Sequence, residues 1–242
     1  MLSVETASNQ LASMESPPFL LSMDRVTKDY KSDGQSVRAL NDVSIQVGAG
    51  RFVALVGRSG CGKSTLLNLA GAMDFPTRGQ VLIDGIVTEY LSEAQLTKLR
   101  REKIGFIFQS FQLLHTLNVI ENVEIPLLLA GHSNARPLAF ERLESVELAD
   151  LAKRMPHQLS GGQMQRVAIA RSLVHSPRIL LADEPTGNLD TATGNSILNI
   201  LQQICSEQKM TILMATHSAE SASFVDTVVR MQDGQIKEIV RS

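Results

Sequence analysis

The sequence predicts an α/β fold in which a mostly parallel core sheet carries an N-terminal antiparallel β subdomain and an inserted helical subdomain. Three continuous apolar runs, at 52–56, 179–182 and 212–215, are typical of strands buried on both faces of a parallel sheet. The stretch 43–47 instead alternates apolar and polar residues, as a half-exposed strand does. Helical patterns lie between the apolar runs, as the crossover connections of parallel strands require.

Composition narrows the class of protein. The 242 residues are 43% apolar and 20% charged, as in ordinary folded domains, and the net charge of −2 offers no basic surface for a nucleic-acid backbone. No stretch approaches the ~18 uncharged apolar residues of a membrane span, and no signal peptide is expected at the N-terminus. The two cysteines, Cys61 and Cys205, fit neither a disulfide framework nor a zinc motif. A dedicated nucleic-acid binder and a complete transmembrane transporter are therefore disfavoured.

The N-terminal part divides into a leader and the start of a domain. Residues 1–18 are polar, Ser-rich and aperiodic, and we expect them to form a disordered leader, followed by one domain over 19–242. The stretches 20–26 and 37–40 are expected to pair with 43–47 in the antiparallel sheet. Aromatic residues make up only 4% of the chain, so the core is expected to consist of Leu, Ile, Val and Ala.

The middle and the end of the chain follow other patterns. Residues from about 110 to 160 interrupt the succession of strands and helices and are mostly helical in pattern, which predicts the inserted subdomain. Near the end, the stretches 225–231 and 235–240 flank Asp233 and Gly234. An Asp-Gly pair between two apolar stretches predicts a β-hairpin.

A phosphate-binding motif follows the first buried strand. The pattern Gly-x-x-x-x-Gly-Lys-Ser starts at Gly57, between a predicted strand and a predicted helix, and this context disfavours a chance glycine-rich turn. Glycines let backbone N–H groups curl around phosphate oxygens at the positive end of a helix. Lys63 supplies a cation for the β- and γ-phosphates, and the Ser64 hydroxyl can bind Mg²⁺. The predicted phosphate-binding residues are Gly57, Arg58, Ser59, Gly60, Cys61, Gly62, Lys63, Ser64 and Thr65.

Two adjacent carboxylates supply the other half of a nucleotide site. The run 179–182 brings Asp183 and Glu184 to the end of a buried strand, where uncompensated carboxylates would be costly. Asp183 can hold Mg²⁺ directly or through water, and Glu184 can polarise a hydrolytic water. Helix caps also produce an apolar run that ends in Asp-Glu, so this motif is specific only together with the P-loop.

A second anion site is predicted at the sequence Leu-Ser-Gly-Gly-Gln, residues 159–163, which precedes a helical pattern. Only one P-loop is present, so this second site has no phosphate-binding loop of its own. With this motif, the chain from Leu20 to its end resembles the ATP-binding-cassette (ABC) ATPases, and residues 160–163 correspond to the signature loop of that family. The resemblance implies further landmarks in family order: Tyr30 as the aromatic residue on adenine, Gln109 as the Q-loop, Ser160, Gly161, Gly162 and Gln163 as the signature, Asp190 in the D-loop at 188–190, and His217 as the switch histidine.

Three of these landmarks have ordinary structural alternatives. Tyr30 could be a strand-edge aromatic residue, Gln109 a polar residue that ends a strand, and His217 a capping or core histidine. We favour function because Gln109 stands at the entry to the helical block and His217 follows a central strand, at the same sheet edge as Asp183. The other histidines have no such placement and are expected to face solvent: His115, His132, His157 and His175.

The resemblance also implies a mechanism shared by two chains. Two copies pair head to tail, each signature loop completes the P-loop site of the other copy, and ATP closes the dimer. The resemblance implies that the P-loop with Lys63 binds the phosphates, and that Ser64, Asp183 and Gln109 bind Mg²⁺. It implies that Glu184 activates water. Ser160 and Gly162 are implied to contact the γ-phosphate bound by the partner copy, and His217 is implied to sense the γ-phosphate.

Three more stretches, at 104–114, 116–123 and 184–190, resemble the branch of the family that contains the lipoprotein-releasing and macrolide-export ATPases. The branch implies a peripheral ATPase subunit on the cytoplasmic face of the inner membrane, bound to integral-membrane permease subunits, that powers export of lipoprotein or other hydrophobic cargo. Two features depart from the branch pattern and weaken the cargo assignment. One is His115, at a position where proline is common, and the other is the short helical block. Alternatives are macrolide or peptide efflux, an ATP-gated regulatory module, and a soluble ABC ATPase acting on nucleic acid or ribosomes, which the lack of a coiled coil or a second cassette disfavours.

Overall fold

The computed structural model describes residues 19–32 and 35–241, so the predicted leader lies outside the described residues. The core sheet has the strand order β10-β9-β3-β8-β7-β6. Its strands from β9 to β6 are parallel, and β9 and β10 form an antiparallel hairpin, which confirms the predicted core sheet and the predicted hairpin. The strand bounds are β3 Phe52–Val56, β6 Ile104–Ile107, β7 Ile179–Asp183, β8 Thr211–Thr216, β9 Thr227–Gln232 and β10 Gln235–Arg241.

The second sheet is antiparallel, as predicted, with the order β2-β1-β4-β5. The prediction that 37–40 pairs with 43–47 is wrong, because both stretches belong to β2. Between them Asp42 has a left-handed φ of 56°, and the register against β1 shifts there. This bulge bends the strand without ending it. The alternation of apolar and polar residues does not reveal that the strand continues through the bulge. The bounds are β1 Leu21–Ser32, β2 Gln35–Val47, β4 Arg78–Ile83 and β5 Ile86–Val87.

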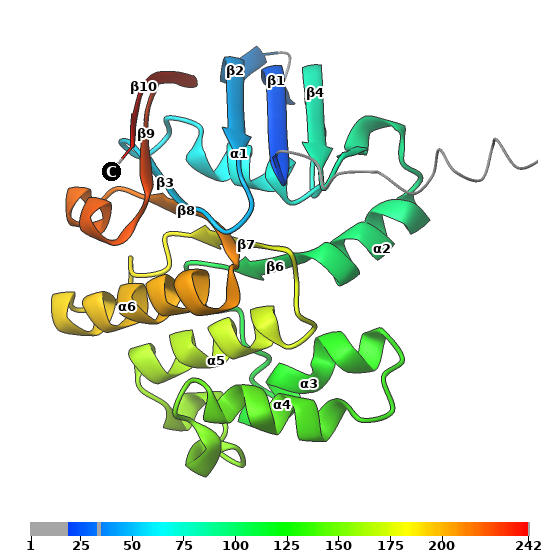
Figure 1. Ribbon diagram of the computed structural model, residues 1–242, viewed down its shortest axis with the longest axis vertical. Coiled ribbons are helices and arrows are strands. Elements are labelled where there is room, and N and C mark those ends of the chain that lie inside the picture. The colour runs from blue at the N-terminus through cyan, green and yellow to red at the C-terminus, as the bar shows by residue number, and fades with distance from the viewer. Residues whose placement is uncertain (1–18, 33–34, 242) are drawn as a thin grey trace, which may run out of the picture.

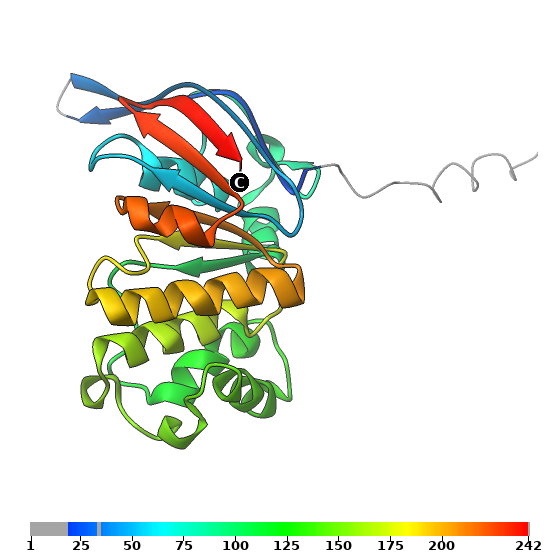
Figure 2. The same cartoon turned by 60° about the vertical axis from the view of Figure 1, so that its left-hand side comes forward.

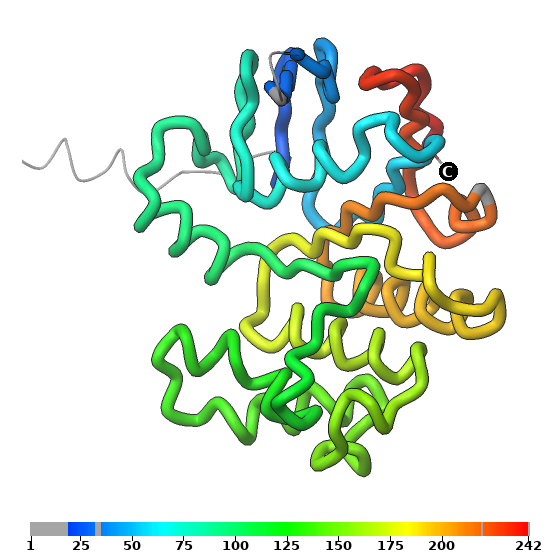
Figure 3. Tube along the Cα trace, turned by 180° about the vertical axis from the view of Figure 1, so that it is seen from behind, coloured from blue at the N-terminus to red at the C-terminus, as the bar shows by residue number. Residues whose placement is uncertain are grey.

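The helices lie on both sides of the core sheet. Figures 1 and 3 show from opposite sides that the antiparallel sheet and α3–α5 occupy opposite ends of the molecule, and Figure 2 shows α6 beside the core strands. Among residues 19–32 and 35–241, no helix combines the length and the apolar character that crossing a bilayer requires. The α-helices are α1 Lys63–Ala70, α2 Glu93–Lys103, α3 Val119–Leu129, α4 Ala135–Glu144, α5 Gly161–Leu173 and α6 Thr191–Gln208, and 3₁₀ turns span Thr88–Tyr90, Ala149–Leu151, Pro156–Gln158 and Ala219–Phe224.

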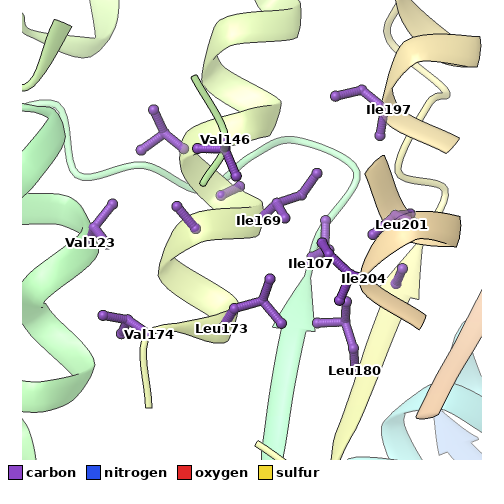
Figure 4. Packing of buried hydrophobic residues seen from close by; sticks show 14 of the residues in the cluster. Ile107, Val123, Val146, Ile169, Leu173, Val174, Leu180, Ile197, Leu201 and Ile204 are labelled. Atoms are coloured by element: carbon purple, nitrogen blue, oxygen red, sulfur yellow. The ribbon is translucent and has the colours of Figure 1, made fainter. Parts of the chain in front are cut away.

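Two hydrophobic cores lie on the two faces of the parallel sheet. Along β3, Phe52 and Ala54 point into one core, and Val53 and Leu55 point into the other. The first core packs the sheet against α3–α6, as Figure 4 shows for strand residues Ile107 and Leu180. The second core packs it against α1 and the antiparallel sheet. Because both faces are covered, the carboxyl ends of β3, β8 and β7 are fixed side by side at one edge of the sheet.

Candidate nucleotide-binding site

The loop between β3 and α1 is held in a tight curve. Gly60 and Gly62 have φ values of 80° and 103°, which side chains other than glycine rarely adopt. A Cβ on Gly62 would lie 2.6 Å from the carbonyl oxygen of Ala39, so the site also lacks room for a side chain. Lys63 begins α1, is only 6% exposed, and donates hydrogen bonds from Nζ to the carbonyl oxygens of Gly57 at 2.8 Å and Arg58 at 3.2 Å. The sequence therefore folds into a glycine-rich loop that surrounds an ammonium group.

Asp183 and Ser64 meet at this edge of the sheet. Asp183 ends β7, and the Ser64 hydroxyl donates to its Oδ1 at 3.1 Å. Burial raises the pKa of the Asp183 carboxyl, because the partly dry surroundings disfavour its charged form, and nearby Glu184 adds to this. Mg²⁺ takes one or two protein oxygens and completes its shell with water and phosphate, so this hydroxyl and this carboxylate fit that cation.

Glu184 lies between Lys63 and His217. Its Oε1 is 3.7 Å from Lys63 Nζ. Its Oε2 accepts a hydrogen bond from His217 Nδ1 at 2.8 Å and from the His217 backbone N–H at 3.3 Å. Glu184 itself has a left-handed φ of 48°, and its backbone N–H donates to the carbonyl oxygen of Ala215 in β8. The structure thus brings together the P-loop lysine, the second carboxylate and the predicted switch histidine.

Gln109 follows β6 and lies beside the segment 187–190. The Asn188 side chain donates to the Gln109 carbonyl oxygen at 2.9 Å. The Gln109 amide nitrogen lies 3.1 Å from the position that a Cβ on Gly187 would occupy. No hydrogen bond among the described residues joins Gln109 to Ser64 or Asp183. Gln109 therefore lies just after β6 and next to residues 187–190.

Tyr30 lies on β1 close to the first turn of α1. The residue is 39% exposed, and its hydroxyl donates to Asp74 Oδ2 at 2.9 Å. Burial raises the pKa of this hydroxyl, and a hydrogen bond with Thr65 opposes that change. Because Thr65 belongs to α1, this contact places Tyr30 beside the P-loop helix. Lys28 Nζ lies 4.9 Å from the ring centroid and also bonds to Asp74. A flat, partly exposed ring next to the phosphate loop suits stacking on a base. Lys28 and Asp74, which fix the ring, belong to no motif, so sequence reasoning missed them.

The signature loop at 160–163 forms a second helix N-terminus. Ser160 caps α5 by accepting from the Gln163 backbone N–H at 3.3 Å, and the Gln163 side chain accepts from the Ser160 backbone N–H at 2.9 Å. Asp190 caps α6 in the same way, by accepting from the Thr193 backbone N–H at 3.0 Å. A Cβ on Gly162 would lie 2.5 Å from Thr193 Cγ2, so the two helix starts are in close contact. Within the described part of the chain, no hydrogen bond joins 160–163 to the P-loop.

The remaining histidines divide into two groups. His115, His132 and His157 are exposed, as predicted. The prediction that His175 faces solvent is wrong. It is half-buried after α5, its Nε2 lies 3.0 Å from the carbonyl oxygen of Ile104 in β6, and burial lowers the pKa of its ring. A helix end that meets a strand from elsewhere in the chain leaves no local sequence signal.

A P-loop between β3 and α1, with two carboxylates at the end of the parallel strand β7, which is separated from β3 by β8, defines a P-loop nucleotide-binding protein. Residues 40–187 match the ABC transporter family. The chain is 42% identical over 224 residues to the ABC transporter ATP-binding protein MJ0796 of Methanocaldococcus jannaschii, an alignment that covers 90% of this chain and 95% of the relative.

Two further comparisons agree. The solved dimeric post-hydrolysis state of the MJ0796 cassette with ADP and Pi matches with a TM-score of 0.84 and 41% identity, over 91% of this chain and 98% of that chain. The macrolide export ATP-binding/permease protein MacB of Rhodopirellula baltica is 44% identical over 218 residues, which are 88% of this chain but only 32% of the relative. The chain belongs to the ABC transporter family and is an ATPase cassette of that family.

Proposed function

We propose that the chain is the ATP-hydrolysing subunit of a membrane ABC transporter, peripheral on the cytoplasmic face of the inner membrane and bound to integral-membrane permease subunits. The observation that carries this proposal is the contact of Glu184 with both Lys63 and His217 at the P-loop. A carboxylate held there can accept a proton from water beside a bound γ-phosphate. The signature loop lies on a separate helix, where it can serve a second copy.

Each site residue has a proposed part in ATP binding. Backbone N–H groups of residues 57–65 surround the phosphates, and Lys63 exchanges its carbonyl contacts for phosphate oxygens. Tyr30 stacks on adenine. Ser64, Asp183 and Gln109 would hold Mg²⁺, and when bound the cation would neutralise phosphate charge. His217 orients Glu184 through their 2.8 Å contact and responds to the γ-phosphate.

The proposed active form is a head-to-tail homodimer. The N-terminus of α5, with the backbone N–H groups that follow Ser160, is suited to an anion. In the dimer, Ser160 and Gly162 of one copy face the γ-phosphate bound by the other, and Asp190 lies near the same junction. The dimeric relative that holds ADP and Pi supports this arrangement.

The proposed cargo is a lipoprotein or another hydrophobic molecule that leaves the inner membrane. The MacB relative is named as an export protein, and this supports outward transport. Because the chain spans only 32% of that relative, macrolide or peptide efflux is the second candidate. Co-purification with a polytopic membrane protein supports the transporter assignment, whereas a stable complex with nucleic acid contradicts it.

The variant Glu184→Gln tests the proposed chemistry. The neutral amide cannot accept the proton, so we expect kcat for ATP to fall by about 100-fold or more, while ATP binding is retained. Size-exclusion chromatography with ATP should then show an accumulated dimer. Exposed Glu144→Gln is the matched control, and its turnover should equal that of the wild type. Unchanged turnover in Glu184→Gln would refute the role of Glu184.

A further inference from the structure

Thr193 of α6 occupies the space beside the second glycine of the signature loop. A Cβ on Gly162 would lie 2.5 Å from Thr193 Cγ2, closer than Cβ atoms approach other atoms in proteins. Its next neighbour would be Thr193 Cβ at 3.9 Å, and outside the backbone of α5 and the adjacent residues no other heavy atom of the described residues lies within 4 Å. One methyl group of Thr193 therefore leaves Gly162 no room for a side chain.

Asp190 holds the Thr193 side chain in this orientation. The Thr193 hydroxyl donates to Asp190 Oδ2 at 2.5 Å, and the Thr193 backbone N–H donates to Asp190 Oδ1 at 3.0 Å. The Cβ of threonine carries both the hydroxyl and the methyl group, so a rotation that moves the methyl away from Gly162 also breaks the hydroxyl bond. The bonds from Thr193 also lower the pKa of the Asp190 carboxyl, which is therefore an ionised acceptor at neutral pH.

Gly162 carries one of the free donors at the start of α5. The first backbone N–H groups of an α-helix have no partner within the helix. Among residues 19–32 and 35–241, the Ser160 side chain accepts from the Gln163 N–H, and no hydrogen bond is recorded for the N–H groups of Gly161 and Gly162. The place from which Gly162 presents its N–H depends on the position of the first turn of α5, which the contact with Thr193 limits on one side.

We propose that Thr193 is a positioning residue for the signature loop. This inference rests on the proposed function, because the signature loop serves the phosphate bound by a second copy only in the proposed dimer. The Thr193 methyl sets how closely the first turn of α5 approaches α6, and thereby the place of the Gly162 N–H. Thr193 does not contact nucleotide. Asp190 acts through Thr193 on the signature loop of its own chain.

A different explanation for the glycine at 162 leads to other results. In that explanation, a side chain at 162 would collide with the nucleotide bound by the other copy, and Thr193 would have no part in the requirement for glycine. Removal of the Thr193 methyl would then not compensate for a side chain at 162. The two explanations are separated by a pair of substitutions, Gly162→Ala and Thr193→Ser.

The test compares Gly162→Ala, Thr193→Ser and the double variant with wild type in the full chain. Serine keeps the hydroxyl that bonds to Asp190 and removes only Cγ2, which leaves the Cβ at 193 at 3.9 Å, an ordinary van der Waals distance. In Gly162→Ala we expect kcat for ATP to fall about 30-fold, since misplaced groups at a reaction site cost up to about 100-fold. Thr193→Ser should lower kcat about threefold, and the double variant should return to about the Thr193→Ser value. The ATP dissociation constant should stay within about twofold of wild type in all three variants.

Gly161→Ala, with and without Thr193→Ser, is the matched control. A Cβ on Gly161 would have Leu189 Cδ2 at 3.2 Å as its nearest neighbour, and Thr193 is not among its neighbours within 4 Å. Thr193→Ser should therefore not restore the activity of Gly161→Ala. Equal recovery of both alanine variants overturns the inference, because the effect of Thr193→Ser would then be unspecific.

Thermal unfolding without nucleotide gives a readout that does not need turnover. The contact lies within one chain, so Gly162→Ala should lower Tm by about 4 °C or more, and the double variant should recover at least about half of that decrease. Without a contact with Thr193, alanine should instead maintain or raise Tm, because it favours a helix more than glycine does. An undiminished Tm in Gly162→Ala, a wild-type kcat in Thr193→Ser, or a double variant as slow as Gly162→Ala overturns the inference. If the wild type itself does not hydrolyse ATP, the proposed function fails, whereas the Tm comparison still decides whether Thr193 restricts Gly162.

Discussion

Replacing Asn122 by alanine is expected to lower the free energy of unfolding substantially. The side chain is 0% exposed; its Oδ1 accepts from the Leu114 N–H at 2.7 Å, and its Nδ2 donates to the carbonyl oxygens of Leu114, Leu117 and Asn118 at 3.1, 3.0 and 3.0 Å. Backbone bonds still serve the carbonyls of Leu114 and Asn118 in the variant. The N–H of Leu114 and the carbonyl of Leu117 lose these partners, at about 1.5 kcal/mol each, so the expected loss is about 3 kcal/mol.

Equilibrium urea unfolding of wild type and Asn122→Ala measures this difference. For a chain of this size, the same loss corresponds to a decrease in Tm of about 6–12 °C. Asn199→Ala on the exposed side of α6 is the control and should change stability by less than about 0.5 kcal/mol. A loss of less than about 1 kcal/mol in Asn122→Ala would show that these hydrogen bonds do not hold the loop, and the reasoning above would be wrong.

Two further substitutions test the nucleotide site. Burial raises the pKa of Asp183, so the carboxyl favours the folded state below its ordinary pKa, and this contribution is lost as the pH rises through the raised value. Without Mg²⁺ and nucleotide, Asp183→Asn should therefore raise Tm at pH 7, by a gain that shrinks towards pH 4; a lower Tm at pH 7 contradicts the argument. Asp74→Asn replaces the carboxylate that bonds to Tyr30 and Lys28. Calorimetry should show ATP binding weakened about fivefold, the equivalent of about 1 kcal/mol, with binding of inorganic tripolyphosphate unchanged; equal losses for both ligands would show that Asp74 does not act through the base.

The centre of the site could be predicted from the sequence because its signals are local. The P-loop lies between an apolar strand and a helix, and the run 179–182 leads directly to Asp183. Strand burial on both faces follows from continuous apolar sequence, so the shared sheet edge could be expected as well. Once those strands pair in parallel, Asp183, Glu184 and His217 have to lie near Lys63.

The supports around the site could not be predicted, because each joins residues that are distant in the sequence. Lys28 and Asp74 are 46 positions apart, and Arg171 donates to the carbonyl oxygen of Phe111, which is 60 positions away. Periodicity indicates which face of a helix is buried, but it does not indicate which backbone carbonyl a buried arginine or histidine will meet. The burial of His175 could not be predicted for this reason, since its partner Ile104 is 71 positions away.

The contacts of Lys63 have a consequence for ligand selectivity. Its ammonium group has two carbonyl oxygens and a carboxylate nearby, at 2.8, 3.2 and 3.7 Å. An incoming anion therefore has to replace existing electrostatic partners before it gains anything from this cation. A singly charged anion such as chloride gains little by that exchange, whereas a triphosphate brings several charges at once. The contacts of Lys63 therefore favour polyphosphate ligands over small singly charged anions.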